Sequence, residues 1–130
     1  MEQLVGIVLV SHSAELARGL AAVAAQVAGP DVRIEAAGGD TDGGLGTSAD
    51  RVEDAIRRAD AGGGVVVLAD LGSAILTVRD ILEDHADGAV RLADAPIVEG
   101  AVAAAVTAAT GQPLEAVVQA AEEARDARKL

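Results

Sequence analysis

The 130-residue sequence contains no cysteine, no phenylalanine, tyrosine or tryptophan, and only two histidines. Without cysteine the chain can form neither a disulfide nor a thiolate metal site, and two histidines almost exclude a structural zinc site, so we expect no bound metal. With no aromatic side chain available, the core must be filled by Val, Ala, Leu and Ile. Such a core requires close backbone contacts, as in a parallel sheet covered by helices on both faces.

Basic residues are also scarce. Ten Lys and Arg stand against twenty-one Asp and Glu, which gives a formal net charge of −11. This charge repels polyanions and leaves no basic stripe, so nucleic-acid binding is excluded. No apolar stretch approaches the ~20 residues of a membrane span. The first residues, MEQLVGIVLVSH, lack the form of a signal peptide, so we expect a cytoplasmic protein without a membrane span.

The usual nucleotide-binding and serine-hydrolase motifs are missing from the sequence. There is no G-x-x-x-x-G-K-[ST], no G-x-G-x-x-G after the first aliphatic run and no G-x-S-x-G. We therefore expect that the chain binds neither ATP nor NAD by itself and that it needs no cofactor.

Short aliphatic runs alternate along the chain with segments of helical periodicity. The aliphatic runs predict strands at 4–10, 32–36, 65–69 and 89–92. The periodic segments predict helices at 14–28, from 47 or 48 to 59, and at 74–84, 96–109 and 113–127. This alternation implies right-handed crossovers. We predict a single α/β domain over residues 1–130, with a mostly parallel central sheet and helices on both faces.

Three polar clusters follow the first three predicted strands. They are Ser11-His12-Ser13, the glycine-dense loop 38–46 with Thr47-Ser48, and Asp70-Leu71-Gly72-Ser73. In an open parallel sheet the ligand crevice lies outside the carboxyl ends of the strands. We therefore expect these clusters to converge on one rim of the sheet.

His12 is the candidate nucleophile of this rim. A neutral imidazole combines a nitrogen lone pair with a second nitrogen that a neighbour can hold, and Asp70 can accept the proton of that second nitrogen. Backbone N–H groups at the starts of the following helices can receive phosphate oxygens, and the hydroxyls of Thr47 and Ser73 would add donors.

Purely structural interpretations of the same residues remain open. A histidine between a strand and a helix is often a satisfied loop residue, the serines and Thr47 can act only as helix caps, and the glycine loop can be a simple connection. His85 is expected at the surface without a role. Arg51, Arg57 and Arg58 are expected on the solvated face of a helix.

Four stretches together carry a family resemblance: GIVLVSHSAELARG at 6–19, AAGGDTDGGLGTSAD at 36–50, VVVLADLGSAILT at 65–77 and LADAPIVEGAVAAAV at 92–106. In this order they resemble the phosphotransfer subunit of bacterial dihydroxyacetone kinase, a relative of the mannose-type enzyme IIA domains of the sugar phosphotransferase system. The resemblance implies a mannose-type enzyme IIA fold. It also implies that His12 is the phosphorylated histidine, that Asp70 is its partner, and that Gly39, Thr47 and Ser73 lie in stretches lining the phosphate pocket.

The same resemblance implies a route for the phosphoryl group. His12 would accept it from the small carrier HPr and pass it to ADP held on the nucleotide-binding kinase subunit. The resemblance further implies a homodimer. Some relatives continue into HPr-like and enzyme I-like domains; none follows Leu130 here, so we expect a separate donor protein.

Three alternatives stay open. The domain can serve a mannose-type sugar permease, it can be a receiver-like signalling module phosphorylated on Asp70, or it can be a structural or ligand-sensing module without covalent chemistry. A receiver needs an acidic pair after the first strand, where Ser11-His12-Ser13 stands. We also expect Asp40 and Asp42 to point away from His12, because further negative charge there would repel phosphate.

Overall fold

A parallel sheet of four strands forms the centre of the protein in a computed structural model that describes residues 3–40, 42, 44–85 and 87–130. The strands lie in the order β2-β1-β3-β4. Their bounds are Gly6–Ser11 (β1), Ile34–Gly38 (β2), Val65–Ala69 (β3) and Val90–Leu92 (β4). Every strand pair among the described residues is parallel, in agreement with the predicted sheet.

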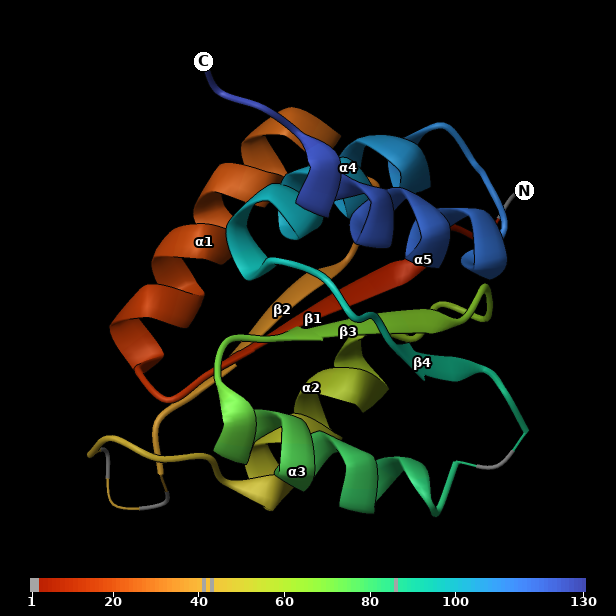
Figure 1. Cartoon of the computed structure of the whole chain (residues 1–130). Helices are drawn as coiled ribbons and strands as arrows, with labels where there is room; N and C mark the ends of the chain where they lie inside the picture. Colours follow the sequence, from red (N-terminus) through yellow and green to blue (C-terminus); the bar gives the residue numbers. More distant parts are fainter. Residues whose placement is uncertain (1–2, 41, 43, 86) are drawn as a thin grey trace.

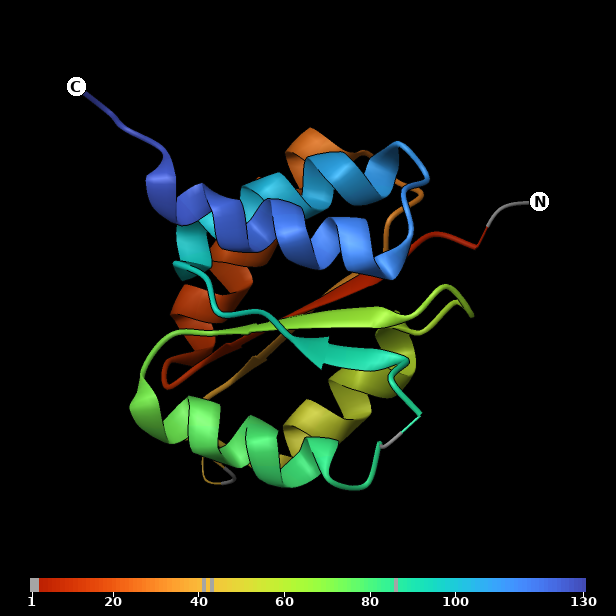
Figure 2. The same cartoon turned by 45° about the vertical axis from the view of Figure 1, so that its right-hand side comes forward.

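Helices cover both faces of the sheet, as the alternating pattern predicted (Figures 1 and 2). One face carries α1 (Ala14–Ala28), α4 (Ile97–Ala109) and α5 (Leu114–Glu123), which continues into a short 3-10 helix (Ala124–Asp126). The opposite face carries α2 (Ala49–Ala59) and α3 (Gly72–Leu82). None of the helices in the described ranges combines the length and the apolar character required to cross a membrane.

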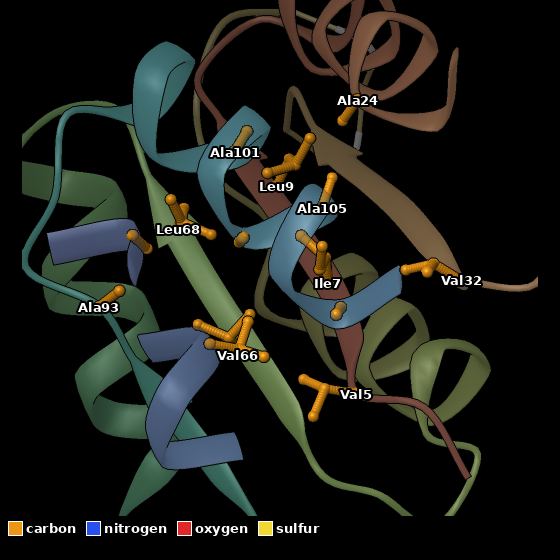
Figure 3. Packing of buried hydrophobic residues seen from close by; sticks show 14 of the residues in the cluster. Val5, Ile7, Leu9, Ala24, Val32, Val66, Leu68, Ala93, Ala101 and Ala105 are labelled. Atoms are coloured by element: carbon orange, nitrogen blue, oxygen red, sulfur yellow. The ribbon is translucent and has the colours of Figure 1, made fainter. Parts of the chain in front are cut away.

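The strands are buried on both faces because each helical layer packs on alternate side chains. Ile7 and Leu9 of β1 pack toward α1 and α4, whereas Val8 and Val10 pack toward α2 and α3. Figure 3 shows Ala101 and Ala105 of α4 lying over Ile7 and Leu9. These small side chains let the helix approach the sheet closely, so the aliphatic core needs no aromatic residue.

Several boundaries differ from the prediction. The first strand is displaced from 4–10 to 6–11, and the second from 32–36 to 34–38, because β1 and β2 pair from Ile7 with Ile34 to Ser11 with Gly38. Helix α3 begins at Gly72 rather than 74, and the final helix ends at 123 rather than 127. The glycine-dense loop was predicted to begin at residue 38, but Gly38 ends β2 instead; Thr41 and Gly43 lie outside the described residues.

Gly38 brings the end of β2 against the start of α1. A Cβ at this position would lie 2.6 Å from the carbonyl oxygen of Ser13 and 2.7 Å from the Cα of Ala14. Both contacts are with backbone, which cannot rotate away. A side chain here must therefore displace the segment that follows His12.

We expect Gly38→Ala to lower the free energy of unfolding by about 1–3 kcal/mol through this overpacking. Gly19→Ala is the matched control, because Gly19 lies in α1 and a Cβ there would meet no atom within 4 Å. The control should gain up to about 1 kcal/mol from higher helix propensity. Denaturant unfolding of both variants tests this; equal stability of the two would contradict the described close approach.

Candidate functional site

The pairing of β1 with β3 brings two of the predicted clusters together. Val10 is the register partner of Ala69, and the backbone N–H of Asp70 donates to the carbonyl oxygen of Val10 at 3.1 Å. Ser11 and His12 therefore leave β1 at the level where Asp70 leaves β3. Residues separated by 58 positions in the sequence thus become neighbours at the rim of the sheet.

The Asp70 carboxylate accepts four hydrogen bonds. Its Oδ1 lies 2.9 Å from Nδ1 of His12 and 2.7 Å from the backbone nitrogen of Leu71. Its Oδ2 accepts from the Ser11 hydroxyl at 2.8 Å and from the backbone N–H of His12 at 3.1 Å. The carboxylate therefore holds both the backbone and the ring of His12.

This arrangement determines the tautomer of His12. The carboxylate can only accept, so Nδ1 must carry the proton, and Nε2 presents its lone pair. Nε2 contacts the Ser73 hydroxyl, which must then donate to it. The His12 side chain is 24% exposed and that of Asp70 is 10% exposed, so the free nitrogen is accessible while its holder is largely covered.

Opposing effects act on the pKa of the Asp70 carboxyl. Burial is the largest single effect and raises this pKa, but the hydrogen bonds from the Ser11 hydroxyl, from the backbone and ring of His12 and from the backbone of Leu71 lower it. Together these bonds hold the pKa of Asp70 below its usual value of 3.8. The carboxylate is therefore charged at neutral pH and can balance a positive charge on the imidazole.

The start of α3 adds donors on the Nε2 side of the ring. Leu71 occupies the N-cap position and supplies no side-chain hydrogen bond to the first turn. The first N–H groups of a helix have no intrahelical partner and carry partial positive charge, which favours an anion. Ser73 lies in this first turn and places its hydroxyl against Nε2. The Ser73 hydroxyl thus stands beside Nε2 at the start of a helix, an arrangement suited to receiving phosphate oxygens.

The glycine loop reaches the same rim by backbone contacts. Gly39, at φ 78°, forms an isolated parallel bridge with Thr47. The N–H of Gly39 donates to the Ser11 carbonyl at 3.3 Å, and that of Gly46 donates to the His12 carbonyl at 3.0 Å. The hydroxyl of Thr47 is buried without a hydrogen-bond partner among the described residues. The described contacts of Gly39 and Thr47 are with each other and with backbone, so their role in the pocket stays a prediction.

Ser11 is part of the hydrogen-bond network around Asp70, a position that the sequence did not predict. It is fully buried; its hydroxyl donates to Asp70 and accepts from the backbone N–H of Ser13 at 3.0 Å. A serine at the end of an otherwise aliphatic strand could have indicated this hydrogen bond, because a buried hydroxyl needs a hydrogen-bond partner.

The remaining polar side chains near the rim are engaged elsewhere. Oδ1 of Asp40 accepts from the N–H groups of Asp42 at 3.0 Å and Gly44 at 2.8 Å, so this carboxylate turns into its own loop, in agreement with the prediction for Asp40. Ser13 caps α1, and Ser48 rather than Thr47 caps α2.

Comparison of the sequence with known protein families identifies the family of this chain. The family model for the IIA component of the fructose phosphotransferase system, EIIA-man, matches residues 6–118, which include both strand ends of the site. The chain belongs to this family. The mannose-type enzyme IIA fold that the resemblance implied is therefore confirmed.

Two curated relatives share a name. The phosphoryl donor subunit DhaM of the PEP-dependent dihydroxyacetone kinase of Pantoea ananatis is 39% identical over 132 residues, which cover 97% of this chain and 28% of that protein. The DhaM subunit of dihydroxyacetone kinase 2 of Listeria innocua is 36% identical, with 89% of this chain and 95% of the relative covered. The chain thus spans less than a third of the first relative and nearly all of the second.

A solved structure agrees with the fold. The crystal structure of a protein of unknown function superimposes with a TM-score of 0.80 at 35% identity, and the match covers 92% of this chain and 94% of the other. The architecture described above is therefore shared over nearly the whole chain.

The lowered pKa of Asp70 predicts a pH-dependent contribution to stability. Since the folded-state pKa lies below the unfolded-state value, the contribution is present above the unfolded pKa and is lost as pH falls through the folded one. We expect Asp70→Asn to lower the free energy of unfolding by about 1–3 kcal/mol at pH 7. The deficit should shrink below about pH 4.

Denaturant titrations at pH 7 and at about pH 3 measure this deficit. Asp80→Asn, an exposed position on α3, is the control and should show little deficit at either pH. A deficit for Asp70→Asn that is unchanged at the lower pH would contradict the prediction.

Proposed function

We propose that this chain is the phosphoryl carrier of a phosphoenolpyruvate-dependent dihydroxyacetone kinase, and that it accepts the phosphoryl group from HPr on Nε2 of His12. The observation that carries the proposal is the hydrogen bond between Nδ1 of His12 and the ionised Asp70, which leaves Nε2 as the ring nitrogen with a lone pair. The relatives named as phosphoryl donor subunits support the choice of kinase system.

Uptake of the phosphoryl group needs no proton transfer in this geometry. The Nε2 lone pair attacks phosphorus, the bond from phosphorus to the donor histidine breaks, and its electron pair returns to the donor ring. The His12 ring then carries positive charge while Nδ1 keeps its proton, and Asp70 balances that charge. The Ser73 hydroxyl must turn from Nε2 to a phosphate oxygen, where the first turn of α3 supplies further donors.

The second transfer is the reverse step with a different acceptor. A β-phosphate oxygen of ADP, held on the nucleotide-binding kinase subunit, attacks phosphorus, and the bond from phosphorus to Nε2 breaks. Its electron pair restores the neutral ring, and ATP is formed on the partner. Both steps depend on alignment and charge neutralisation, which suits an accessible nitrogen at a rim. Transfer to a mannose-type sugar permease would use the same chemistry, and the DhaM relatives favour the kinase.

A receiver-like role for Asp70 is disfavoured by its contacts. Both carboxylate oxygens already accept two hydrogen bonds each, so neither is free to attack phosphorus.

The family resemblance also leads us to propose a homodimer.

Incubation with phosphoenolpyruvate, enzyme I and HPr tests the carrier function. We expect an acid-labile, alkali-stable phosphoryl group on the protein that is lost in His12→Ala. His85→Ala is the matched control, because His85 also forms a histidine–carboxylate pair, with Nε2 lying 3.3 Å from Glu53, yet stands in a different part of the fold. Labelling that survives in His12→Ala rejects the proposal.

Ser73→Ala tests the role of the Ser73 hydroxyl. Removal of one hydroxyl donor to the developing phosphate charge should slow phosphorylation by HPr by about tenfold or more. Thr77→Val is the control, since the Thr77 hydroxyl lies one turn further along α3 and donates to the Ser73 carbonyl at 3.1 Å. Initial rates of label uptake measure both; equal rates in the two variants would remove Ser73 from the phosphate site.

A further inference from the structure

A hollow of about 380 Å³ lies beside the site on its β2 side. Its walls come from the start of α1, from the glycine loop and from α2, and they include Ser13, Glu15, Arg18, Gly44, Leu45 and Arg51. Ser13 directly follows His12, and the loop that forms the other wall is fastened to the His12 carbonyl through Gly46. The hollow therefore adjoins the segment that carries the nucleophile.

Two arginines stand against one glutamate, Glu15, in the lining of this hollow, so its charge is net positive, in contrast to that of the whole chain. Arg51 is exposed on α2, as expected, and its Nη1 donates to the carbonyl oxygen of Gly38 at 3.0 Å, which holds the side chain across the end of β2. Within the described part of the chain, neither Arg18 nor Arg51 forms an ion pair, whereas Arg57 and Arg58 pair with Asp54 and Glu35. Other arginines of the described residues, such as Arg79 and Arg91, also form no ion pair, but Arg18 and Arg51 are the two that line this hollow.

The two transfers of the proposed function place different amounts of negative charge beside His12. The transfer from phosphohistidine brings one phosphoryl group. The transfer to a nucleoside diphosphate brings the same group together with two further phosphates. Cations in the hollow that adjoins this segment would stabilise the second encounter more than the first, since exposed charges interact over about 10 Å at ordinary ionic strength.

We infer that Arg18 and Arg51 receive the nucleotide-bearing acceptor partner, and that their positive charge compensates the additional phosphate charge of its nucleoside diphosphate. This inference rests on the proposed function. Leu45, which is 80% exposed on the outer wall of the hollow, offers the same partner an apolar contact. Arg18 and Arg51 thus act as specificity determinants for the second transfer, while His12, Asp70 and Ser73 serve both transfers.

The test separates the two half-reactions in Arg18→Gln, Arg51→Gln and the double variant. Each protein is first labelled from phosphoenolpyruvate through enzyme I and HPr, and the label is then passed to the kinase subunit loaded with ADP. We expect each single variant to raise the KM for the ADP-loaded subunit by about two- to fivefold. Uptake from HPr should change by less than about twofold, because mutation of charges at a rim acts mainly on the encounter that they steer.

Added salt gives a second readout. It should slow the transfer to ADP more in the natural sequence than in the double variant, because screening weakens only the charges that are present. Arg128→Gln is the matched control, since it removes the same charge from the exposed tail that follows the 3-10 helix, and it should leave both transfers unchanged.

The outcomes are distinguishable. If the natural sequence takes no label, the proposed function fails and this inference falls with it. If the natural sequence completes both transfers and the variants match it, or if both half-reactions slow equally, the inference alone is overturned. Should Arg51→Gln unfold through loss of its contact with Gly38, Arg18→Gln decides, because among the described residues the Arg18 side chain forms no hydrogen bond.

Discussion

The Asp70 carboxylate is the link on which the rest of the site depends. It joins the ends of two parallel strands by accepting the Ser11 hydroxyl, the backbone of His12 and the His12 ring. Hydrogen bonds to a charged acceptor are stronger than those between neutral groups, so one side chain orients the imidazole, fixes its tautomer and supplies the opposing charge. The geometry of the proposed phosphoryl-transfer site therefore follows from the register in which β1 pairs with β3.

Much of the fold could be predicted because it is encoded in local patterns. Aliphatic runs alternating with helical periodicity are sufficient to indicate a parallel sheet with helices on both faces. The ends of elements were harder to predict, because tertiary contacts decide them. Gly38 was assigned to a loop as part of a glycine-dense stretch, yet it extends β2 since its missing side chain lets the strand approach Ser13 and Ala14.

The site was partly predictable for a related reason. Ligand-binding residues of open parallel sheets lie at the carboxyl ends of the strands, so the sequence predicted that His12, Asp70 and Ser73 lie close together. The structure brings them into contact. The hydrogen bonds of Ser11 and Arg51 were not predicted. Both depend on side-chain directions that the sequence does not specify: Arg51 is exposed, as expected, but its hydrogen bond with the Gly38 carbonyl has no signal in the sequence.

Nuclear magnetic resonance of the His12 ring nitrogens, correlated with the ring protons before and after phosphorylation, tests the central claim most directly. We expect a neutral ring protonated at Nδ1 in the free protein and phosphorus bonded to Nε2 after transfer. A free ring protonated at Nε2, or phosphorus found on Nδ1, would contradict it, because Asp70 would then not be holding the nitrogen assigned to it.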